Sequence, residues 1–231
     1  MSGFDRPSLL AKLEQGSNAL GLALDATTID RLLDYLALLS KWNAVYNLTA
    51  VRDPQQMVVQ HLLDSLASWP YCMAARNLLD VGAGGGLPGL VLAICAKQLQ
   101  PIMKIALVDT VHKKTAFLTQ AKAELGLTNV TVHTARVEQL QLAGHFDVIT
   151  SRAFADLANF VQWSSHLLAP GGHFVAMKGQ LPQDEIDALP SDWEANEIRA
   201  LQVPGMQAER HLVFIRRRTE QDGSKRAAFS M

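Results

Sequence analysis

The chain has few of the residues that mark several specialised classes of protein. Only two of its 231 residues are cysteine, and no Cys/His cluster has the spacing of a zinc site, so we expect no metal. Cys95 falls in an apolar run and Cys72 in what reads as a polar connector. Two such residues indicate reduced thiols in a cytoplasmic protein rather than a disulfide framework.

An excess of positive charge is also absent. The chain has 21 Lys and Arg residues against 22 Asp and Glu, a net charge of −1, so any contact with nucleic acid must come from a local patch. No apolar run reaches transmembrane length and none precedes Leu9, which predicts neither a membrane span nor a signal peptide. With 48% apolar residues, the chain can bury the core of one α/β domain with an extension.

The most informative stretch is LLDVGAGGGLPG, from Leu78 to Gly89. Its apolar start reads as the end of a buried strand, its glycines as a turn and the following residues as a helix. A strand, a glycine turn and a helix N-terminus let backbone amides approach a ligand closely. Gly84, Gly86 and Gly89 also satisfy the dinucleotide spacing G-x-G-x-x-G, so the spacing alone does not name the ligand.

Asp80, which precedes the first glycine, favours a methyl-donor site. A carboxylate there would repel the pyrophosphate of a dinucleotide and attract the ammonium group of S-adenosylmethionine. No Lys-Ser or Lys-Thr follows the glycines, which argues against a nucleotide-kinase loop. A tight structural turn is the simpler interpretation, but five glycines in eight residues exceed what a turn needs. We therefore predict that the methyl donor is bound at this turn, by Asp80, Gly82, Gly84 and Gly86.

The organisation of the chain changes once, near residues 71–77. Before this point, an apolar face from Ile29 to Trp42 predicts a helix capped by Thr27 or Thr28, with further helices at 8–16 and 57–67. After it, β-rich and helical segments alternate, as in a parallel sheet with crossover helices. The last two strands read as a hairpin that adds antiparallel strands. Strands are expected at 77–81, 104–109, 130–134, 146–150, 172–177, 193–201 and 211–216, and helices at 87–99, 112–125 and 156–168.

This pattern predicts an α/β fold in three parts. Residues 1–76 are expected to form a helical extension packed on a Rossmann-like catalytic domain at 77–218. The polar, small-residue-rich segment 219–231 is expected to be a frayed tail.

Three features follow strands, at the edge where an open α/β sheet binds ligands. Asp109 ends the second strand, about 20 residues after the glycines, where a carboxylate can accept from ribose hydroxyls. A solvated strand-end aspartate is the alternative. Val137 and Glu138 follow the third strand and are placed to meet the edge of an adenine, although a Glu that opens a helix is commonly a favourable N-terminal charge. Arg152 follows the fourth strand, which usually faces the methyl group in methyl-transfer enzymes of this architecture.

The absence of certain motifs after the fourth strand reduces the number of atoms that the enzyme could methylate. Transferases that act on exocyclic amines of bases usually carry Asn/Asp-Pro-Pro-aromatic there, and the chain lacks it. Methylation of carbon 5 of a pyrimidine needs a cysteine nucleophile, and neither Cys72 nor Cys95 is suitably placed. The remaining kind of methyl acceptor is an atom that is already nucleophilic. Ring nitrogen 7 of guanine is one, because it has no proton to lose. Its methylation needs proximity and alignment rather than a general base.

Six short motifs extend the pattern over nearly the whole chain. They are NLTAVRD at 47–53, HLLDS at 61–65, DVGAGGGLPG at 80–89, SRAF at 151–154, KGQ at 178–180 and ERH at 209–211. In this order and spacing they resemble the bacterial small-subunit ribosomal RNA methyltransferase G family (RsmG, also called GidB). The resemblance implies a Rossmann-like class I S-adenosylmethionine-dependent methyltransferase with a seven-stranded, mostly parallel sheet and an N-terminal helical extension.

The resemblance also implies a reaction. S-Adenosylmethionine would donate a methyl group to nitrogen 7 of guanine 527, in the 530 loop of 16S rRNA, leaving S-adenosylhomocysteine. Loss of the enzyme would give low-level streptomycin resistance. Ala83 stands where many members have Thr or Ser, which removes a hydroxyl near the donor's carboxylate. Carried over by position, the family's donor site comprises Gly82, Leu87, Val137, Glu138 and Arg152.

Further residues receive a role from this match. Asn47 and His61 are predicted to line the guanine pocket with Arg152, as positioning groups and not as bases. A helix cap and a core hydrogen-bonding pair of His61 with Asp64 are the alternative. Candidates for RNA contact, or else ordinary solvated charges, are Arg136, Lys178 and Arg210.

The slightly negative chain is expected to bind RNA weakly by itself. Its substrate would then be 16S rRNA within the 30S subunit or a late assembly intermediate, and we expect the enzyme to be a monomer. Two other classes of function stay open: a small-molecule methyltransferase on the same fold, and an NAD-dependent or nucleotide-binding regulatory protein. Comparison of the thermal stabilisation of the protein by S-adenosylhomocysteine with that by NAD distinguishes methyltransferases from NAD-dependent proteins.

Overall fold

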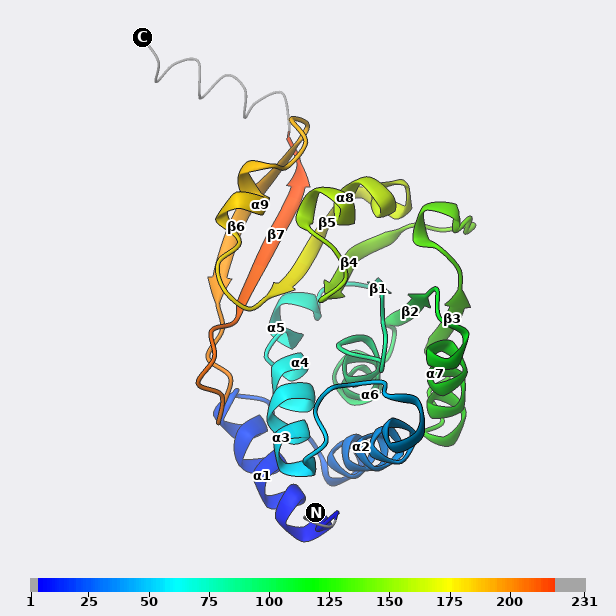
Figure 1. Ribbon diagram of the computed structural model, residues 1–231, viewed down its shortest axis with the longest axis vertical. Helices are drawn as coiled ribbons and strands as arrows, with labels where there is room; N and C mark the ends of the chain where they lie inside the picture. The colour runs from blue at the N-terminus through cyan, green and yellow to red at the C-terminus, as the bar shows by residue number, and fades with distance from the viewer. Residues whose placement is uncertain (1–3, 219–231) are drawn as a thin grey trace.

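Seven strands form one sheet in the computed structural model, which describes residues 4–218 (Figure 1). Their order is β3-β2-β1-β4-β5-β7-β6. Within the described residues, β7 alone runs against its neighbours, so the sheet is mostly parallel, as predicted. The predicted antiparallel pair at the end is formed by β6 and β7, but only β7 opposes the parallel strands, because β6 pairs only with β7 and therefore runs in the direction of β5. The strands are β1 (Asn77–Val81), β2 (Lys104–Asp109), β3 (Val130–Thr134), β4 (Phe146–Arg152), β5 (Leu168–Lys178), β6 (Trp193–Ala200) and β7 (His211–Arg217).

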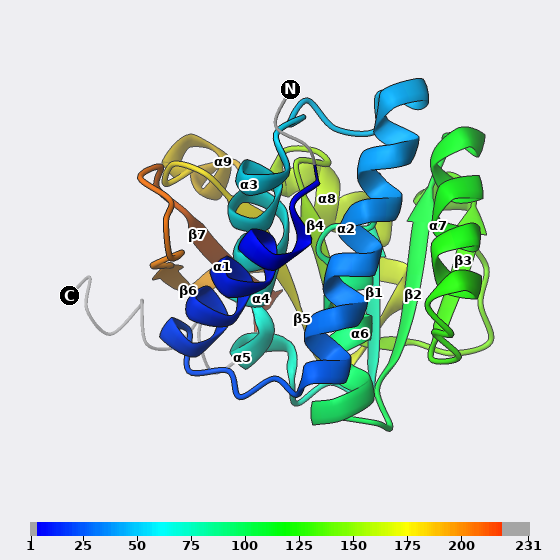
Figure 2. The same cartoon turned by 90° about the horizontal axis from the view of Figure 1, so that it is seen from below.

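Helices cover both faces of the sheet, as Figure 2 shows for α6 and α7 on one side and α8 on the other. The predicted helix at 156–168 is shorter than expected, because its last turn is a 3-10 turn and the chain from Leu168 already belongs to β5. Between β3 and β4 there is only a single 3-10 turn in place of a crossover helix. These elements are α6 (Gly89–Leu99), α7 (His112–Glu124), η2 (Val137–Gln139), α8 (Leu157–Ser164), η3 (Ser165–Leu167) and α9 (Gln183–Asp187).

The N-terminal part is helical, as predicted, but its details differ. The second helix is capped by Asp25, whose carboxylate accepts from the backbone N–H of Thr28 at 2.7 Å, and not by Thr27 or Thr28. The predicted helix at 57–67 is divided by a turn of π-helix, in which the N–H of Asp64 reaches the carbonyl of Val59. These elements are α1 (Arg6–Ala19), α2 (Ala26–Tyr46), α3 (Pro54–Met57), η1 (Val58–Leu63), α4 (Asp64–Leu66) and α5 (Trp69–Cys72).

One hydrophobic core joins the N-terminal helices to the sheet. Leu32 and Leu36 of α2 are fully buried in the same cluster as Leu90 of α6 and Ile105 of β2. Burial of one such side chain contributes about 1.5–3 kcal/mol, so the helices before β1 are held firmly against the sheet. Whether residues 1–76 form a separate folding unit stays a prediction.

Two other expectations concern Cys72 and the C-terminal segment. Cys72 was expected in a polar connector, but it is buried in α5 under the core and is 1% exposed. The expected frayed tail at 219–231 lies outside the described residues. No helix of residues 4–218 is both long and apolar enough to cross a membrane.

Candidate functional site

The glycine turn after β1 is shaped by its neighbours in the sheet. The backbone N–H groups of Gly82 and Ala83 both donate to the carbonyl of Val108, at 2.9 and 3.1 Å, so the turn closes over the end of β2. Gly82 has φ of +70°, and a Cβ atom there would lie 2.5 Å from the ring of Phe154. This position therefore needs glycine for both its conformation and its space.

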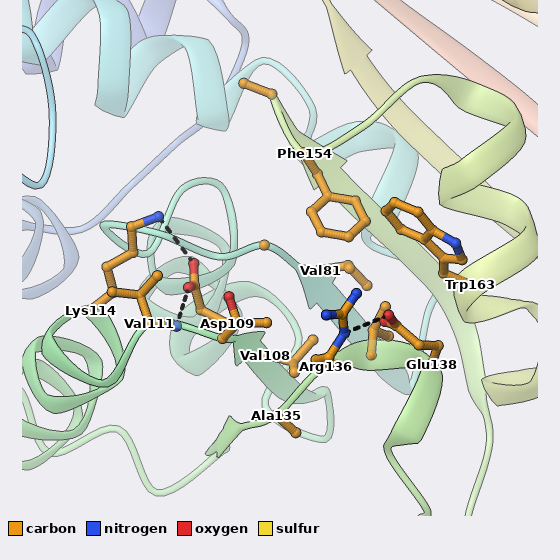
Figure 3. A pocket seen from close by; sticks show the side chains of 14 residues that line it. Val81, Val108, Asp109, Val111, Lys114, Ala135, Arg136, Glu138, Phe154 and Trp163 are labelled. Carbon is orange, nitrogen blue, oxygen red and sulfur yellow. Dashed lines mark hydrogen bonds and ion pairs between the residues drawn. The ribbon is translucent and has the colours of Figure 1, made fainter.

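A pocket of about 520 Å³ opens at the carboxyl ends of β1 to β4, where an open α/β sheet binds ligands (Figure 3). We call it the first pocket. Of the predicted donor residues and RNA-contact candidates, five line it: Gly82, Asp109, Arg136, Val137 and Glu138. Five other predicted donor residues are not part of this lining: Asp80, Gly84, Gly86, Leu87 and Arg152.

Asp109 ties the glycine turn to the start of α7. Its Oδ2 atom accepts from the N–H of Gly84 at 3.0 Å and lies 3.5 Å from Nζ of Lys114, and its Oδ1 atom accepts from the N–H of Val111 at 2.9 Å. The side chain is nearly buried yet lines the first pocket. A carboxylate oxygen can accept more than one hydrogen bond, so Asp109 keeps capacity for hydroxyl donors in the pocket.

Asp80 lies directly beneath the turn and is fully buried. Its Oδ2 atom accepts from the N–H of Gly89 at 2.8 Å, at the first residue of α6. Its Oδ1 atom has no hydrogen-bond partner among the described residues. Burial raises the pKa of this carboxyl to about 7, although the Gly89 N–H and the charge of Arg152 act in the opposite direction. A cationic group at the turn would complete the hydrogen bonding of Asp80.

Charged and aromatic side chains shape the mouth of the first pocket. Nε of Arg136 donates to Oε1 of Glu138 at 2.8 Å. The pKa of Glu138 is lowered, first by its own backbone N–H and then by Arg136. On the other side, Phe154 meets Trp163 edge to face with ring centres 5.9 Å apart, and both line the pocket (Figure 3). An adenine ring could be enclosed between such walls, which fits the predicted roles of Val137 and Glu138.

A second pocket, of about 340 Å³, adjoins the first at the carboxyl ends of β4 and β5. Ala153 lines both pockets, and its φ of 55° is unusual for a residue other than glycine. The predicted residues Arg152, Lys178 and Arg210 all line the second pocket, together with Asp64. Arg152 was expected in the donor site, but the structure places its side chain on the neighbouring side of Ala153.

Asp64 links two of these cations. Its Oδ2 atom accepts from Nη1 of Arg152 at 2.9 Å, and its Oδ1 atom accepts from Nε of Arg210 at 3.0 Å. Nη1 of Arg152 also donates to the carbonyl of Gln60, within the π-helical turn, at 2.7 Å. The Asp64 side chain is only 1% exposed, so its charge is held entirely by these two arginines. π-Helical turns are frequent at functional sites, and here the turn orients an arginine.

Lys178 has its own carboxylate. Its Nζ atom donates to Oε2 of Glu185 at 2.7 Å and to the carbonyl of Ala155 at 3.0 Å. Three cationic side chains around the second pocket therefore share two carboxylates, and the pocket keeps a net positive charge. Such a pocket suits a phosphate or the acceptor edge of a base.

Asn47 and His61 line neither pocket. Asn47 ends α2 in the left-handed conformation, and its Oδ1 atom accepts from Arg52 at 2.7 Å. His61 is buried, and its Nε2 atom lies 2.9 Å from the hydroxyl of Thr49. The considered pairing of His61 with Asp64 is not formed, because both carboxylate oxygens of Asp64 face arginines. Burial, and then the charge of Arg152, lowers the pKa of His61 to about 4.

Sequence reasoning missed several residues of the site. Trp163 and Lys114 line the first pocket but belong to no motif that predicts a ligand, and Ala153 was given no role although it belongs to the SRAF motif. Asp64 was considered only within the HLLDS motif and as a partner of His61, whereas its actual partners are 88 and 146 residues away. Its position within a long apolar segment was the available signal, because a buried carboxylate needs a partner.

The geometry agrees with what comparisons with known proteins show. Residues 28–213 match the family model GidB, described as rRNA small subunit methyltransferase G. The chain is 64% identical over 217 residues to the "Ribosomal RNA small subunit methyltransferase G" of Janthinobacterium sp. (strain Marseille), covering 94% of this chain and 99% of that protein. It is 52% identical to the protein of the same name from Neisseria meningitidis serogroup C, covering 90% and 98%.

Solved structures show the same fold at low sequence identity. The N-methyltransferase NodS from Bradyrhizobium japonicum, in complex with S-adenosylhomocysteine, superposes with a TM-score of 0.52 and 13% identity, over 78% of this chain and all of that chain. The O-methyltransferase TomG from Streptomyces achromogenes, in complex with S-adenosylmethionine, gives 0.50 and 17%, over 80% and 90%. These likenesses confirm the predicted Rossmann-like class I methyltransferase fold.

The residues present fit S-adenosylmethionine. The buried Oδ1 atom of Asp80 lacks a partner among the described residues, Gly82 keeps a Cβ atom away from Phe154 in the wall of the first pocket, and Asp109 offers a carboxylate within it. Among the described residues, no group of three or more His, Cys, Asp or Glu side chains is placed to hold a metal. The cofactor is S-adenosylmethionine, and the predicted resemblance is confirmed: the chain belongs to the rRNA small subunit methyltransferase G family of S-adenosylmethionine-dependent methyltransferases.

Proposed function

We propose that the protein methylates nitrogen 7 of guanine 527 in the 530 loop of 16S rRNA. Family membership supports the RNA substrate, and the pair of pockets that meet at Ala153 supports the transfer. S-Adenosylmethionine in the first pocket would supply a methyl group bound to a positively charged sulfur. The second pocket would hold the guanine nucleotide on the other side of Ala153.

The absence of an available base from the described lining of the second pocket, where the guanine would lie, is the observation that carries the choice of nitrogen 7. Within residues 4–218, no histidine lines either pocket, and His61 is buried with a pKa of about 4. Both oxygens of Asp64 are occupied by Arg152 and Arg210. Nitrogen 7 can attack without losing a proton: its lone pair forms the new bond to carbon while the electrons of the carbon–sulfur bond stay on sulfur. The residues need only align the two reactants and exclude water.

The cations of the second pocket would position the nucleotide. Arg152 and Arg210 keep N–H donors beyond those that Asp64 occupies, and a guanidinium has five. These donors suit the phosphate of the target nucleotide or oxygen 6 of guanine. Lys178, held by Glu185, would add to the positive potential. Arg136, at the mouth of the first pocket, is placed for a flanking phosphate.

We also propose that the substrate is the 30S subunit or a late assembly intermediate, and that the enzyme acts in the cytoplasm as a monomer. The net charge of −1 supports a need for contacts beyond those of an isolated RNA. Sedimentation of the free protein tests the monomer.

The experiment uses 30S subunits and naked 16S rRNA from a strain that lacks the methyltransferase. Each is incubated with the protein and labelled S-adenosylmethionine, and the RNA is digested and mapped by mass spectrometry. We expect one methyl group, at nitrogen 7 of guanine 527, with faster transfer to the 30S subunit. Methylation of another atom would contradict the proposed reaction. Equal rates on both substrates would contradict only the proposal that the 30S subunit is the substrate.

A further inference from the structure

The hollows on this face of the protein continue past the two pockets. Arg210 lines the second pocket and also a third hollow of about 400 Å³, formed by α1, the π-helical turn and the connection between β6 and β7. Lys12 and Gly205 in turn line both that hollow and a fourth of about 210 Å³. Figure 1 shows the connection between β6 and β7 beside α1 and the column of α3 to α5. We call these two hollows the outer groove.

Two residues link the outer groove to the second pocket. Arg210 lines both of them. Gln60 lines the outer groove, and its carbonyl accepts a hydrogen bond from Arg152 of the second pocket. The far wall is close to the π-helical turn, because a Cβ atom on Gly205 would lie 3.3 Å from Val59. The first pocket, the second pocket and the outer groove therefore form one continuous path across the protein.

Polar side chains line the third hollow, whereas the fourth is lined mainly by apolar residues apart from Lys12 and Gln15. Gln56, Gln60 and Gln207 have no side-chain hydrogen-bond partner among residues 4–218, and Lys12 has no carboxylate there within ion-pair distance. No Asp or Glu belongs to the described lining of either hollow. A glutamine amide both donates and accepts, as base edges require, and a lysine suits a phosphate.

We propose that the outer groove binds the single-stranded RNA next to the target guanine. The strand would leave the second pocket over Arg210, seat its bases against the three glutamines and place a phosphate at Lys12. Proteins that recognise RNA by sequence mostly take unpaired nucleotides, whose edges are then free for hydrogen bonds. This proposal rests on the proposed function, because it extends the path of the same RNA beyond the transfer site.

Site-directed cross-linking tests the path. Both natural cysteines are buried, so a cysteine introduced at exposed Ala208 in the outer groove can be labelled selectively with a benzophenone maleimide. The matched control is Gly144→Cys, at an exposed position near the amino ends of the strands, where an added Cβ meets nothing within 4 Å. The probe is the 30S subunit from a strain that lacks the methyltransferase. We expect Ala208→Cys, and not the control, to cross-link within a few nucleotides of the methylated guanine.

A charge substitution gives an independent readout. Lys12→Gln should raise KM for the RNA several-fold with kcat unchanged, and should reduce the salt dependence of RNA binding by about 0.7 in slope, the value for one contact with a single strand. Lys104→Gln removes the same charge at the opposite edge of the sheet and should change neither. Thermal unfolding shows whether each variant is folded.

The outcomes separate the two proposals. Cross-links from Ala208→Cys to distant nucleotides or to a ribosomal protein would overturn the path, as would equal behaviour of Lys12→Gln and Lys104→Gln. In both cases the unmodified enzyme would still methylate the guanine. If the unmodified enzyme does not methylate 16S rRNA in the same assay, the proposed function fails instead.

Discussion

The hydroxyl of Tyr35 donates a hydrogen bond to the carbonyl of Gly85 at 2.5 Å. Tyr35 belongs to α2 and is fully buried, while Gly85 is in the glycine turn after β1. Leu39, one turn further along α2, lies beneath the same glycine, 3.2 Å from where a Cβ atom would be. Helix α2 therefore directly supports the glycine turn that borders the first pocket.

Removal of the Tyr35 hydroxyl should loosen this loop. Tyr35→Phe leaves the Gly85 carbonyl without its buried donor, so we expect a loss of about 1–2 kcal/mol in the free energy of unfolding. Affinity for S-adenosylhomocysteine should fall as well, because the loop is less fixed before binding. Urea unfolding and calorimetry measure the two effects. Tyr46→Phe, at an exposed position of the same helix, is the control and should change neither. A lower free energy of unfolding with unchanged affinity for S-adenosylhomocysteine would mean that α2 stabilises the fold without supporting the site.

Asp64 should matter more for the arrangement of the arginines than for stability alone. Asp64→Asn keeps the shape but leaves Arg152 and Arg210 without their shared carboxylate, which should cost about 2–3 kcal/mol. We also expect a lower kcat on 30S subunits, because Arg152 is no longer oriented. Asp34→Asn makes the same change in an exposed ion pair with Arg6 and should cost about 0.5 kcal/mol or less. A normal kcat for Asp64→Asn would show that the arginines need no such partner.

The sheet and part of the site could be predicted from the sequence for different reasons. Strands β1, β2 and β4 were located because buried parallel strands read as short apolar runs between turns, whereas the largely exposed β6 was read with β7 as a terminal hairpin. Gly82, Asp109 and Glu138 were found because each lies at or shortly after the end of a strand, and the ends of parallel strands meet at one edge. The role of Asp64 could not be derived in the same way, because it depends on partners brought together only by the complete fold. The cap of α2 was missed because Asp25, Thr27 and Thr28 are all acceptable caps by composition.

The chemical step should not depend on a titrating histidine. Since the pKa of His61 is lowered to about 4, it stays neutral under ordinary assay conditions and lines neither pocket. The single-turnover rate should therefore be flat from about pH 6 to about pH 8, where an unperturbed histidine would titrate. Rapid-quench measurements on 30S subunits provide this profile. A steep rise near the ordinary pKa of histidine would contradict methylation without a base.

The stability of the folded protein should also respond to His61 in a defined direction. The unfolded chain binds a proton on this histidine below its ordinary pKa of 6.5, whereas the folded chain does so only near 4. Acidification through this window should therefore destabilise the protein.

Asp80 should couple binding of the cofactor to pH in the opposite sense. Its pKa is raised from 3.8 to about 7, so between these values the folded protein retains a proton that the unfolded chain has lost. The contribution of Asp80 to stability is therefore lost as pH rises through about 7. Because an ammonium group prefers the ionised carboxylate, affinity for S-adenosylhomocysteine should increase over the same range, with release of a proton. Calorimetry in two buffers of different ionisation enthalpy measures that proton. Asp80→Asn should remove the pH dependence, and a variant that retains it would exclude Asp80 as the source.

Gly82 and Gly126 allow the contact with Phe154 to be separated from backbone strain. Both have positive φ, +70° and +62°, but an added Cβ meets Phe154 at 2.5 Å in the first case and nothing within 4 Å in the second. Gly126→Ala should therefore cost only the strain of the left-handed conformation, about 1–2 kcal/mol, with normal affinity for S-adenosylhomocysteine. Gly82→Ala should cost more and also weaken that affinity, because Phe154 must move within the wall of the first pocket. Urea unfolding and calorimetry on both variants measure the difference. If the two substitutions reduce stability equally and leave affinity unchanged, the close approach of Phe154 to Gly82 has no role in binding the cofactor.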